Sequence, residues 1–170
     1  MKENLYTPNS IRTFTGIYMN VFEPTIDMIR IEDIAHSLSM QCRFGGHLPE
    51  FYSVAQHSYL VSKILPKKHA LAGLLHDASE AYLIDFASPI KHNINGYYEL
   101  EDRLMKLIAE KFEFEYPLSK QVKEADKGLL HYEWLRIMLK KPIDDHFSSW
   151  GNKYAEERFI ETFKLLTTNQ

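Results

Sequence analysis

The amino-acid sequence predicts an all-α fold, a helical bundle that carries a small β-hairpin near its N-terminus. Three observations lead to this prediction. Apolar residues recur at helical spacing through most of residues 25–167. β-branched and aromatic residues gather around Gly16 within residues 11–24. No repeat, low-complexity tract or linker divides the chain, so we expect a single domain over residues 1–170.

The first predicted elements follow one another in chain order. Residues 11–24 form the hairpin, and Pro24 ends it. The segment "TIDMIRIEDIAHSLSMQC" is expected to form a helix with Thr25 as its N-cap. The segment "RFGGHLPE" is rich in glycine and proline, which predicts a loop. The next segment, "FYSVAQHSYLVSKIL", is a helix with Ser53 as its expected cap.

Helices also dominate the rest of the chain. In the helix that begins near Ser53, four apolar residues are expected on one face: Val54, Val61, Ile64 and Leu65. Residues 68–83 are predicted to form the next helix, and "DFASPIKHN" a loop held by Pro89. Three amphipathic helices are expected after it: "YYELEDRLMKLIAEKF", "SKQVKEADKGLLHYEWLRIML" and "NKYAEERFIETFKLL".

Composition narrows the function classes. The chain has 170 residues, 45% of them hydrophobic, and a formal net charge of −3, which argues against duplex nucleic acid as a partner. A single cysteine, Cys42, rules out an internal disulfide. The start "MKENLYTPNS" lacks the apolar core of a signal peptide, and no apolar run approaches the length that spans a membrane. We therefore expect a cytoplasmic protein without a membrane partner.

Several polar residues occupy positions where the helical pattern expects apolar ones. His57 falls on the apolar face of its helix, and His76 and Asp77 follow a run of Ala and Leu. Asp126 also lies on an inward stripe, and Glu133 lies two turns further along the same face. For Glu133 we expect an acceptor for a buried arginine or backbone group. For a lone histidine, a core side chain bonded to a carbonyl would be the ordinary explanation.

The four residues His57, His76, Asp77 and Asp126 together suggest a metal site. Buried carboxylates are costly unless they are paired or bind a metal. Two imidazoles and two carboxylates suit Zn, Mn, Co or Fe rather than Ca. The alternative is that the His-Asp pair arose by chance and that these groups are satisfied within the core.

The order of these residues resembles the H…HD…D pattern of HD-domain metal-dependent phosphohydrolases. The segments "CRFGGHLPEFYSVAQHS", "LLHDASEAYLIDFASPIK" and "EADKGLL" look like the short bacterial and phage branch of that family, which contains 5′-deoxynucleotidases and deoxynucleoside triphosphohydrolases. With "IRIEDIAHSLS", the resemblance covers roughly residues 11–135. It implies an HD-domain helical bundle in which His57, His76, Asp77 and Asp126 bind a divalent metal ion.

The resemblance also implies roles around the metal. Glu80 matches a catalytic acidic position that orients the attacking water or helps to hold an additional Mg, Mn or Co ion on the phosphates. Asp85 matches a second acidic position, near the scissile bond and the sugar. Arg43 matches a phosphate-binding arginine, although such a residue is ordinarily a surface ion-pair partner. Lys91 is expected to meet phosphate, with a solvated loop lysine as the alternative.

Three further residues are candidates for substrate binding. His47 is expected either to contact phosphate or to cap its loop. Tyr18 and Phe22, and with them Phe44, are candidates to wall a nucleobase, although aromatic residues at such positions are more often part of the core.

The resemblance implies hydrolysis of a deoxynucleotide. We favour a triphosphohydrolase that releases triphosphate from a purine deoxynucleoside triphosphate such as dATP, and a 5′-deoxynucleotidase acting on monophosphates is the alternative. A di-iron HD oxygenase, which would need more histidines (His36, His69, His92, His131 and His146 remain unassigned), and a non-catalytic HD binding module are more distant. A homo-oligomer would fit the resemblance, and four aromatic residues are candidates for its interface or for the core: Tyr97, Tyr98, Phe147 and Trp150.

Overall fold

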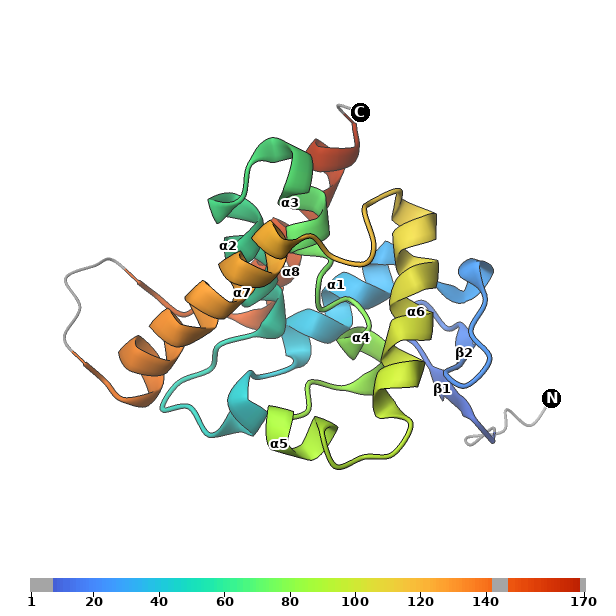
Figure 1. Ribbon diagram of the computed structural model, residues 1–170, viewed down its shortest axis with the longest axis horizontal. Coiled ribbons are helices and arrows are strands. Elements are labelled where there is room, and N and C mark those ends of the chain that lie inside the picture. Colours follow the sequence, from blue (N-terminus) through green and yellow to red (C-terminus); the bar gives the residue numbers. More distant parts are fainter. Residues whose placement is uncertain (1–7, 142–146, 169–170) are drawn as a thin grey trace.

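The N-terminal part of the chain is a two-stranded hairpin, and the remainder is mainly helical (Figure 1). The computed structural model describes residues 8–141 and 147–168. In the hairpin, β1 (Ser10–Arg12) pairs antiparallel with β2 (Tyr18–Asn20), and Ile11 lies opposite Met19. The predicted combination of a helical fold and a small N-terminal hairpin is confirmed, with strands shorter than the predicted range.

The helices follow the hairpin in chain order. The first four are α1 (Ile31–Met40), α2 (Val54–Ile64), α3 (Lys67–Leu74) and α4 (Glu80–Leu83). The next four are α5 (Ser88–Lys91), α6 (Tyr97–Phe112), α7 (Lys120–Glu133) and α8 (Asn152–Thr167). Short 3-10 turns lie at η1 (Ile26–Met28) and η2 (Phe44–Gly46), and a π-helical segment, η3 (Trp134–Met138), continues α7.

Helix α2 is the centre of the packing. It contacts α1, α3, α7 and α8, and α8 in turn packs on α1 and α3. One hydrophobic cluster runs through these helices, from Met19 in the hairpin to Phe159 in α8. In Figure 1, α7 and the hairpin lie toward opposite ends of the molecule. Anything held between α2 and α7 therefore lies far from the hairpin.

Two expectations about helix ends met different outcomes. Ser53 caps α2 as predicted, because its side chain accepts a hydrogen bond from the backbone N–H of Gln56 at 3.1 Å. Thr25 makes no side-chain cap and precedes only the 3-10 turn η1. Ile29 and Arg30 are extended, so α1 begins at Ile31, later than predicted.

The helical face predicted for residues 51–65 is right in part. Val54 and Val61 are buried, whereas Ile64, the last residue of α2, is 58% exposed. The chain is already extended at Leu65 and turns at Pro66 into α3, so the face does not continue through Ile64.

The helix predicted over residues 68–83 is interrupted. α3 ends at Leu74, residues 75–79 form turns, and α4 begins at Glu80. The predicted loop after it contains the short helix α5. The interruption matters because it takes His76 and Asp77 off the helix and into a turn.

Asp33 anchors the hairpin to the helical part. This residue lies in the first turn of α1 and is almost completely buried. Its two carboxylate oxygens accept hydrogen bonds from the backbone N–H and the hydroxyl of Thr15, at 2.7 and 2.8 Å. A carboxylate is also favourable near a helix N-terminus.

Across the described residues, every helix is too short or too polar to pass through a membrane.

Replacing Asp33 should destabilise the fold without touching the pocket described below. Asp33→Ala removes the acceptor of two hydrogen bonds and the carboxylate near the N-terminus of α1, so we expect the free energy of unfolding to fall by about 2 kcal/mol. Urea denaturation followed by circular dichroism measures the change. The exposed neighbour Glu32, replaced by Ala, is the control and should change little. Equal losses in the two variants would contradict the anchoring role.

Candidate metal centre

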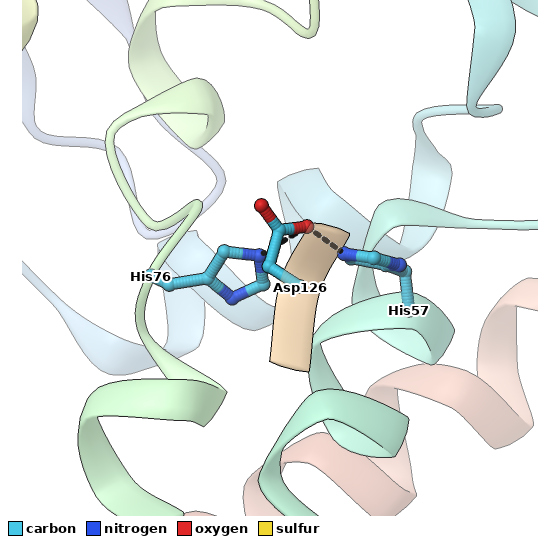
Figure 2. Close-up of side chains that lie close together, drawn as sticks. All are labelled: His57, His76 and Asp126. Atoms are coloured by element: carbon cyan, nitrogen blue, oxygen red, sulfur yellow. Dashed lines mark hydrogen bonds and ion pairs between the residues drawn. The ribbon is translucent and has the colours of Figure 1, made fainter. Parts of the chain in front are cut away.

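Three side chains from separate parts of the chain converge beside α2. His57 comes from α2, His76 from the turn after α3, and Asp126 from α7. One ligand atom of each lies within 4.8 Å of the others, so this group can hold a metal ion. Figure 2 shows the two imidazole rings on either side of the Asp126 carboxylate. Both histidines are buried, and Asp126 is partly open to solvent.

Both histidines turn the same ring nitrogen toward this cluster. The Nδ1 atom of His57 lies 2.7 Å from Glu133 Oε1, and the Nδ1 atom of His76 lies 2.8 Å from the carbonyl oxygen of Gly73. Each Nδ1 therefore has an acceptor behind it, and each Nε2 is left to face Asp126. Metal-binding histidines are commonly held in this way. The Nε2 atom of His76 is buried and has no hydrogen-bond partner within the described residues.

Asp77, the fourth predicted ligand, borders the cluster. Its Oδ2 atom lies 3.2 Å from His76 Nε2 and 4.0 Å from His57 Nε2. The same oxygen lies 3.6 Å from the Nη1 atom of Arg43. The turn that interrupts the predicted helix is what allows two adjacent residues, His76 and Asp77, to face one point.

The charges of the cluster are strongly interdependent. Burial by itself would lower the pKa of His76, but the carboxylates of Asp77 and Asp126 outweigh burial and raise that pKa well above its usual value. Burial would likewise raise the pKa of both aspartates, and the neighbouring histidines outweigh it and lower both. The two carboxylates therefore favour positive charge at this point, either as a proton on His76 or as a metal cation.

A pocket of about 560 Å³ is lined by Asp126 of the cluster and by Asp77. Four of the other predicted site residues also line it: Arg43, Glu80, Asp85 and Lys91. Aromatic and α7 residues complete the wall, among them Phe44, Phe86, Lys127, His131 and Trp134. Of these, only Phe44 was expected from the sequence.

Three residues predicted to bind substrate do not line this pocket. Tyr18 lies in β2, where it pairs with Arg12, and Phe22 follows the hairpin and is 53% exposed. His47 is exposed after η2. The hairpin packs on the core through Met19, away from α7. The aromatic walls of the pocket are instead Phe44, Phe86 and Trp134.

Arg43 is buried and forms a double ion pair. Its Nε atom donates to Glu133 Oε2 at 3.1 Å, while its Nη1 atom faces Asp77. Burial would lower the pKa of Arg43, but Glu133 and Asp77 outweigh it, so the guanidinium stays charged. Positive φ angles at Phe44, Gly45 and Gly46 turn the chain directly after it, a conformation that glycine adopts readily. The prediction of Glu133 as an acceptor for a buried arginine is confirmed.

Glu80 and Lys91 form a second ion pair in the pocket. The Lys91 Nζ atom donates to Glu80 Oε1 and also lies 3.3 Å from Glu101 Oε1. Glu80 is almost fully buried, and its Oε2 atom has no partner within the part of the chain that the structure describes. Burial, then the charges of Asp77 and Asp85, raise the pKa of Glu80. Burial also raises the pKa of Asp85.

Gln41 holds the loop that carries these acidic residues, and sequence reasoning missed it. Its Nε2 donates to the carbonyl of Glu80 at 3.0 Å, and its Oε1 accepts from the backbone N–H of Asp85 at 2.9 Å. Between them, Ile84 has a φ of 70°, which is unusual for a β-branched residue. The side chain of Gln41 thus supports a strained turn. A glutamine at the end of a helix gives no sequence signal for this role.

The remaining histidines lie outside the cluster. His36 pairs with Glu156, His69 lies near Glu115, and His92 bonds to the carbonyl of Ser88. His131 lines the pocket from α7. His146 lies outside the described residues.

The fold and site define a mainly helical protein with a histidine–aspartate cluster that is able to hold a metal ion and that borders a charged pocket through Asp126. The chain is 42% identical over 123 residues to Uncharacterized protein YfdR of Escherichia coli (strain K12), across 72% of this chain and 69% of that protein. It therefore belongs to the same family as YfdR.

A second relative is more distant. Uncharacterized protein RCAP_rcc00048 of Rhodobacter capsulatus is 37% identical over 127 residues, which cover 69% of this chain and 65% of that protein. No family model matches the chain. Neither relative's name states an activity, so the site has to be interpreted from its own chemistry.

Metal binding to the cluster should release protons and weaken as the pH falls. The carboxylates of Asp77 and Asp126 raise the pKa of His76, so a proton competes with a metal ion for this side chain more strongly than for an ordinary histidine. Titration calorimetry with Zn²⁺ at pH 7, in two buffers of different ionisation enthalpy, should give different observed enthalpies. The exposed His92, replaced by Gln, is the control and should behave like the wild type. Identical enthalpies in both buffers would count against this coupling.

Proposed function

We propose that this protein is a metal-dependent phosphohydrolase that acts on deoxynucleotides. The order of the cluster residues resembles the H…HD…D pattern of HD-domain phosphohydrolases. The observation that carries the proposal is that Asp126 of this cluster and the neighbouring Asp77 line a pocket together with further acidic and basic side chains. A phosphoester hydrolase needs these groups together: a metal, a proton acceptor and cations for the phosphate.

The protein side chains have distinct parts in the proposed reaction. His57, His76 and Asp126, with Asp77 beside them, would hold one divalent ion, and their nitrogen and oxygen atoms suit Zn, Mn, Co or Fe. When bound, such an ion acidifies water and polarises a phosphate oxygen. The other tasks fall to the pocket walls.

Glu80 is the best-placed proton acceptor. It is buried, its Oε2 atom has no hydrogen-bond partner among the described residues, and it lines the pocket together with Asp77. Burial and the charges of Asp77 and Asp85 raise its pKa, and a carboxylate with a raised pKa is a stronger base. Asp85, in the same loop, can orient the attacking water or the sugar. Lys91 and Arg43 offer positive charge to the phosphates, Lys91 as a point charge and Arg43 through its remaining N–H donors.

The substrate we favour is a purine deoxynucleoside triphosphate, such as dATP, hydrolysed to the deoxynucleoside and triphosphate. The pocket, at about 560 Å³, has room for more than a phosphate group, and Lys127 and His131 extend its polar wall along α7. Phe44 and Trp134, whose ring centroids are 6.0 Å apart, offer aromatic surface for a base. Additional Mg, Mn or Co ions would accompany the phosphates. A deoxynucleoside monophosphate that loses its 5′-phosphate is the alternative within the same mechanism.

A homo-oligomer also belongs to this proposal. Among the aromatic residues considered for an interface, Tyr97 is buried in the hydrophobic cluster and Trp150 packs against that cluster. Phe147 packs on Tyr52. Tyr98 is 45% exposed and remains a candidate for an interface.

Asp77→Ala should abolish hydrolysis while the protein stays folded. The change removes a carboxylate beside both imidazoles, so we expect at least a thousandfold loss of kcat/KM, about 4 kcal/mol of transition-state stabilisation. The assay uses a panel of deoxynucleoside mono- and triphosphates with Mn²⁺, Co²⁺ and Mg²⁺, and chromatography identifies phosphate, pyrophosphate or triphosphate. Asp102→Ala on α6 is the matched control, because it also removes a paired aspartate but outside the pocket.

The panel can also overturn the proposal. Purified protein that binds metal but releases no phosphate product from any member of the panel would sink it. Phosphate released from monophosphates alone would decide for the 5′-deoxynucleotidase. Two irons per chain with oxygen consumption would favour the oxygenase instead.

Glu80→Gln should separate proton transfer from metal binding. The substitution preserves shape and removes the proton acceptor, so we expect kcat to fall by about 10²–10⁴-fold, as for loss of a general base. Metal content, measured by plasma emission spectrometry, should equal that of the wild type, because Glu80 is outside the three-residue cluster. A variant with unchanged kcat would exclude Glu80 as the base.

A further inference from the structure

The carboxylate of Glu133 is fully buried and has no part in the reaction proposed above. It ends α7, two turns after Asp126, and points to α2 rather than into the pocket. A buried carboxylate is tolerated only when donors surround it. The identity of these donors indicates what the residue does.

Three side chains serve the two oxygens of Glu133. Oε1 accepts a hydrogen bond from the hydroxyl of Tyr52 at 2.6 Å and lies 2.7 Å from His57 Nδ1. Oε2 accepts from Arg43 Nε at 3.1 Å. A carboxylate that already accepts from Tyr52 and Arg43 is an acceptor toward His57 as well, so the hydrogen of this contact sits on Nδ1.

This hydrogen decides which nitrogen of His57 faces the cluster. With Nδ1 protonated and bound to Glu133, Nε2 points to Asp126 Oδ1 at 3.0 Å and to Asp77 Oδ2 at 4.0 Å. Figure 2 shows one nitrogen of the His57 ring directed at the Asp126 carboxylate and the other directed away from it. The contact therefore fixes both the tautomer and the orientation of the ring.

Arg43 extends this control to a second residue. Its guanidinium joins Glu133 on one side and Asp77 on the other, at 3.1 and 3.6 Å. One buried carboxylate thus restrains His57 directly and Asp77 through Arg43.

We propose that Glu133 is a positioning residue for the metal centre, which holds His57 with Nε2 as the ligand atom and ties Arg43 to Asp77. This inference rests on the metal site of the proposed function. A carboxylate behind a ligating histidine orients the ring and raises its basicity, and removing such a partner typically weakens metal affinity.

The test compares Glu133→Gln with a buried carboxylate elsewhere. Asp33→Asn is the matched control, because Asp33 is equally buried and accepts two hydrogen bonds far from the cluster. Competition with a chromophoric chelator gives the affinity for Co²⁺ and Zn²⁺, and thermal denaturation gives the stability of each variant. We expect Glu133→Gln to lower metal affinity about 10–100-fold and to change the visible spectrum of bound Co²⁺. Asp33→Asn should lose stability and keep both the affinity and the spectrum.

A purely structural Glu133 would give a different pattern. Glu133→Gln would then lose stability as Asp33→Asn does, with metal affinity and the Co²⁺ spectrum unchanged, and the inference would be overturned. The proposed function would survive that result, because it depends on the hydrolysis assay. Wild-type protein that binds metal without hydrolysing any nucleotide would overturn the function and leave the role of Glu133 standing.

A measurement on the wild type covers the case in which Glu133→Gln does not fold. In Zn²⁺-loaded protein labelled with ¹⁵N histidine, NMR should show a slowly exchanging Nδ1–H on His57 and a metal-bound Nε2. A His57 that binds zinc through Nδ1, or whose Nδ1–H exchanges freely with water, would contradict the proposal.

Discussion

Charge compensation in a buried space is the constraint on which the centre of this structure depends. Asp77, Glu80 and Glu133 lie within a small region between α2, α4 and α7, together with the more open Asp126. Negative groups at such depth are tolerated only when positive groups or hydrogen-bond donors face them. Each of these carboxylates has such a partner: histidine for the aspartates, arginine and tyrosine for Glu133, and lysine for Glu80. The helices are arranged so that these pairs can form.

The same constraint explains why α2 occupies the centre. This helix contacts α1, α3 and α8, and it presents His57 to α7. Helix α7 is amphipathic and mostly exposed. It nevertheless contributes both acidic partners of His57: Asp126 lies at Nε2 of the ring and Glu133 at Nδ1. Within α7 only Val122 and Glu133 are buried, so the polar contacts of Asp126 and Glu133 are a large part of what joins this helix to α2.

Much of the fold could be predicted from hydrophobic periodicity. The segment 97–112 was expected as a helix and is α6 to the residue. The break at residues 75–79 could not be predicted, because apolar residues continue at helical spacing through Ala78 and Tyr82. Periodicity reports which residues are buried, and it is insensitive to a turn that keeps them buried.

The candidate site was predictable to a similar degree. The predicted residues that line the pocket, from Arg43 to Asp126, were recognised from the order of residue types along the chain. Tyr18 and Phe22 were expected there because aromatic residues suit a base, but no local signal relates the hairpin to α7. Trp134 and His131 were missed for the converse reason: their place follows from the course of α7 and η3 in space. For Glu133 the sequence predicted only that a buried carboxylate needs a partner. It did not identify Arg43 as that partner, because the two residues are distant in the chain and meet only in the fold.

The amide of Gln41 has a mechanical consequence. It belongs to the residue that follows α1, and α1 packs on α8 in the hydrophobic cluster. This amide bonds to the backbones of both Glu80 and Asp85, and it therefore fixes the two acidic residues relative to the core. The spacing of their backbones is thereby tied to the packed core, although both residues line an open pocket.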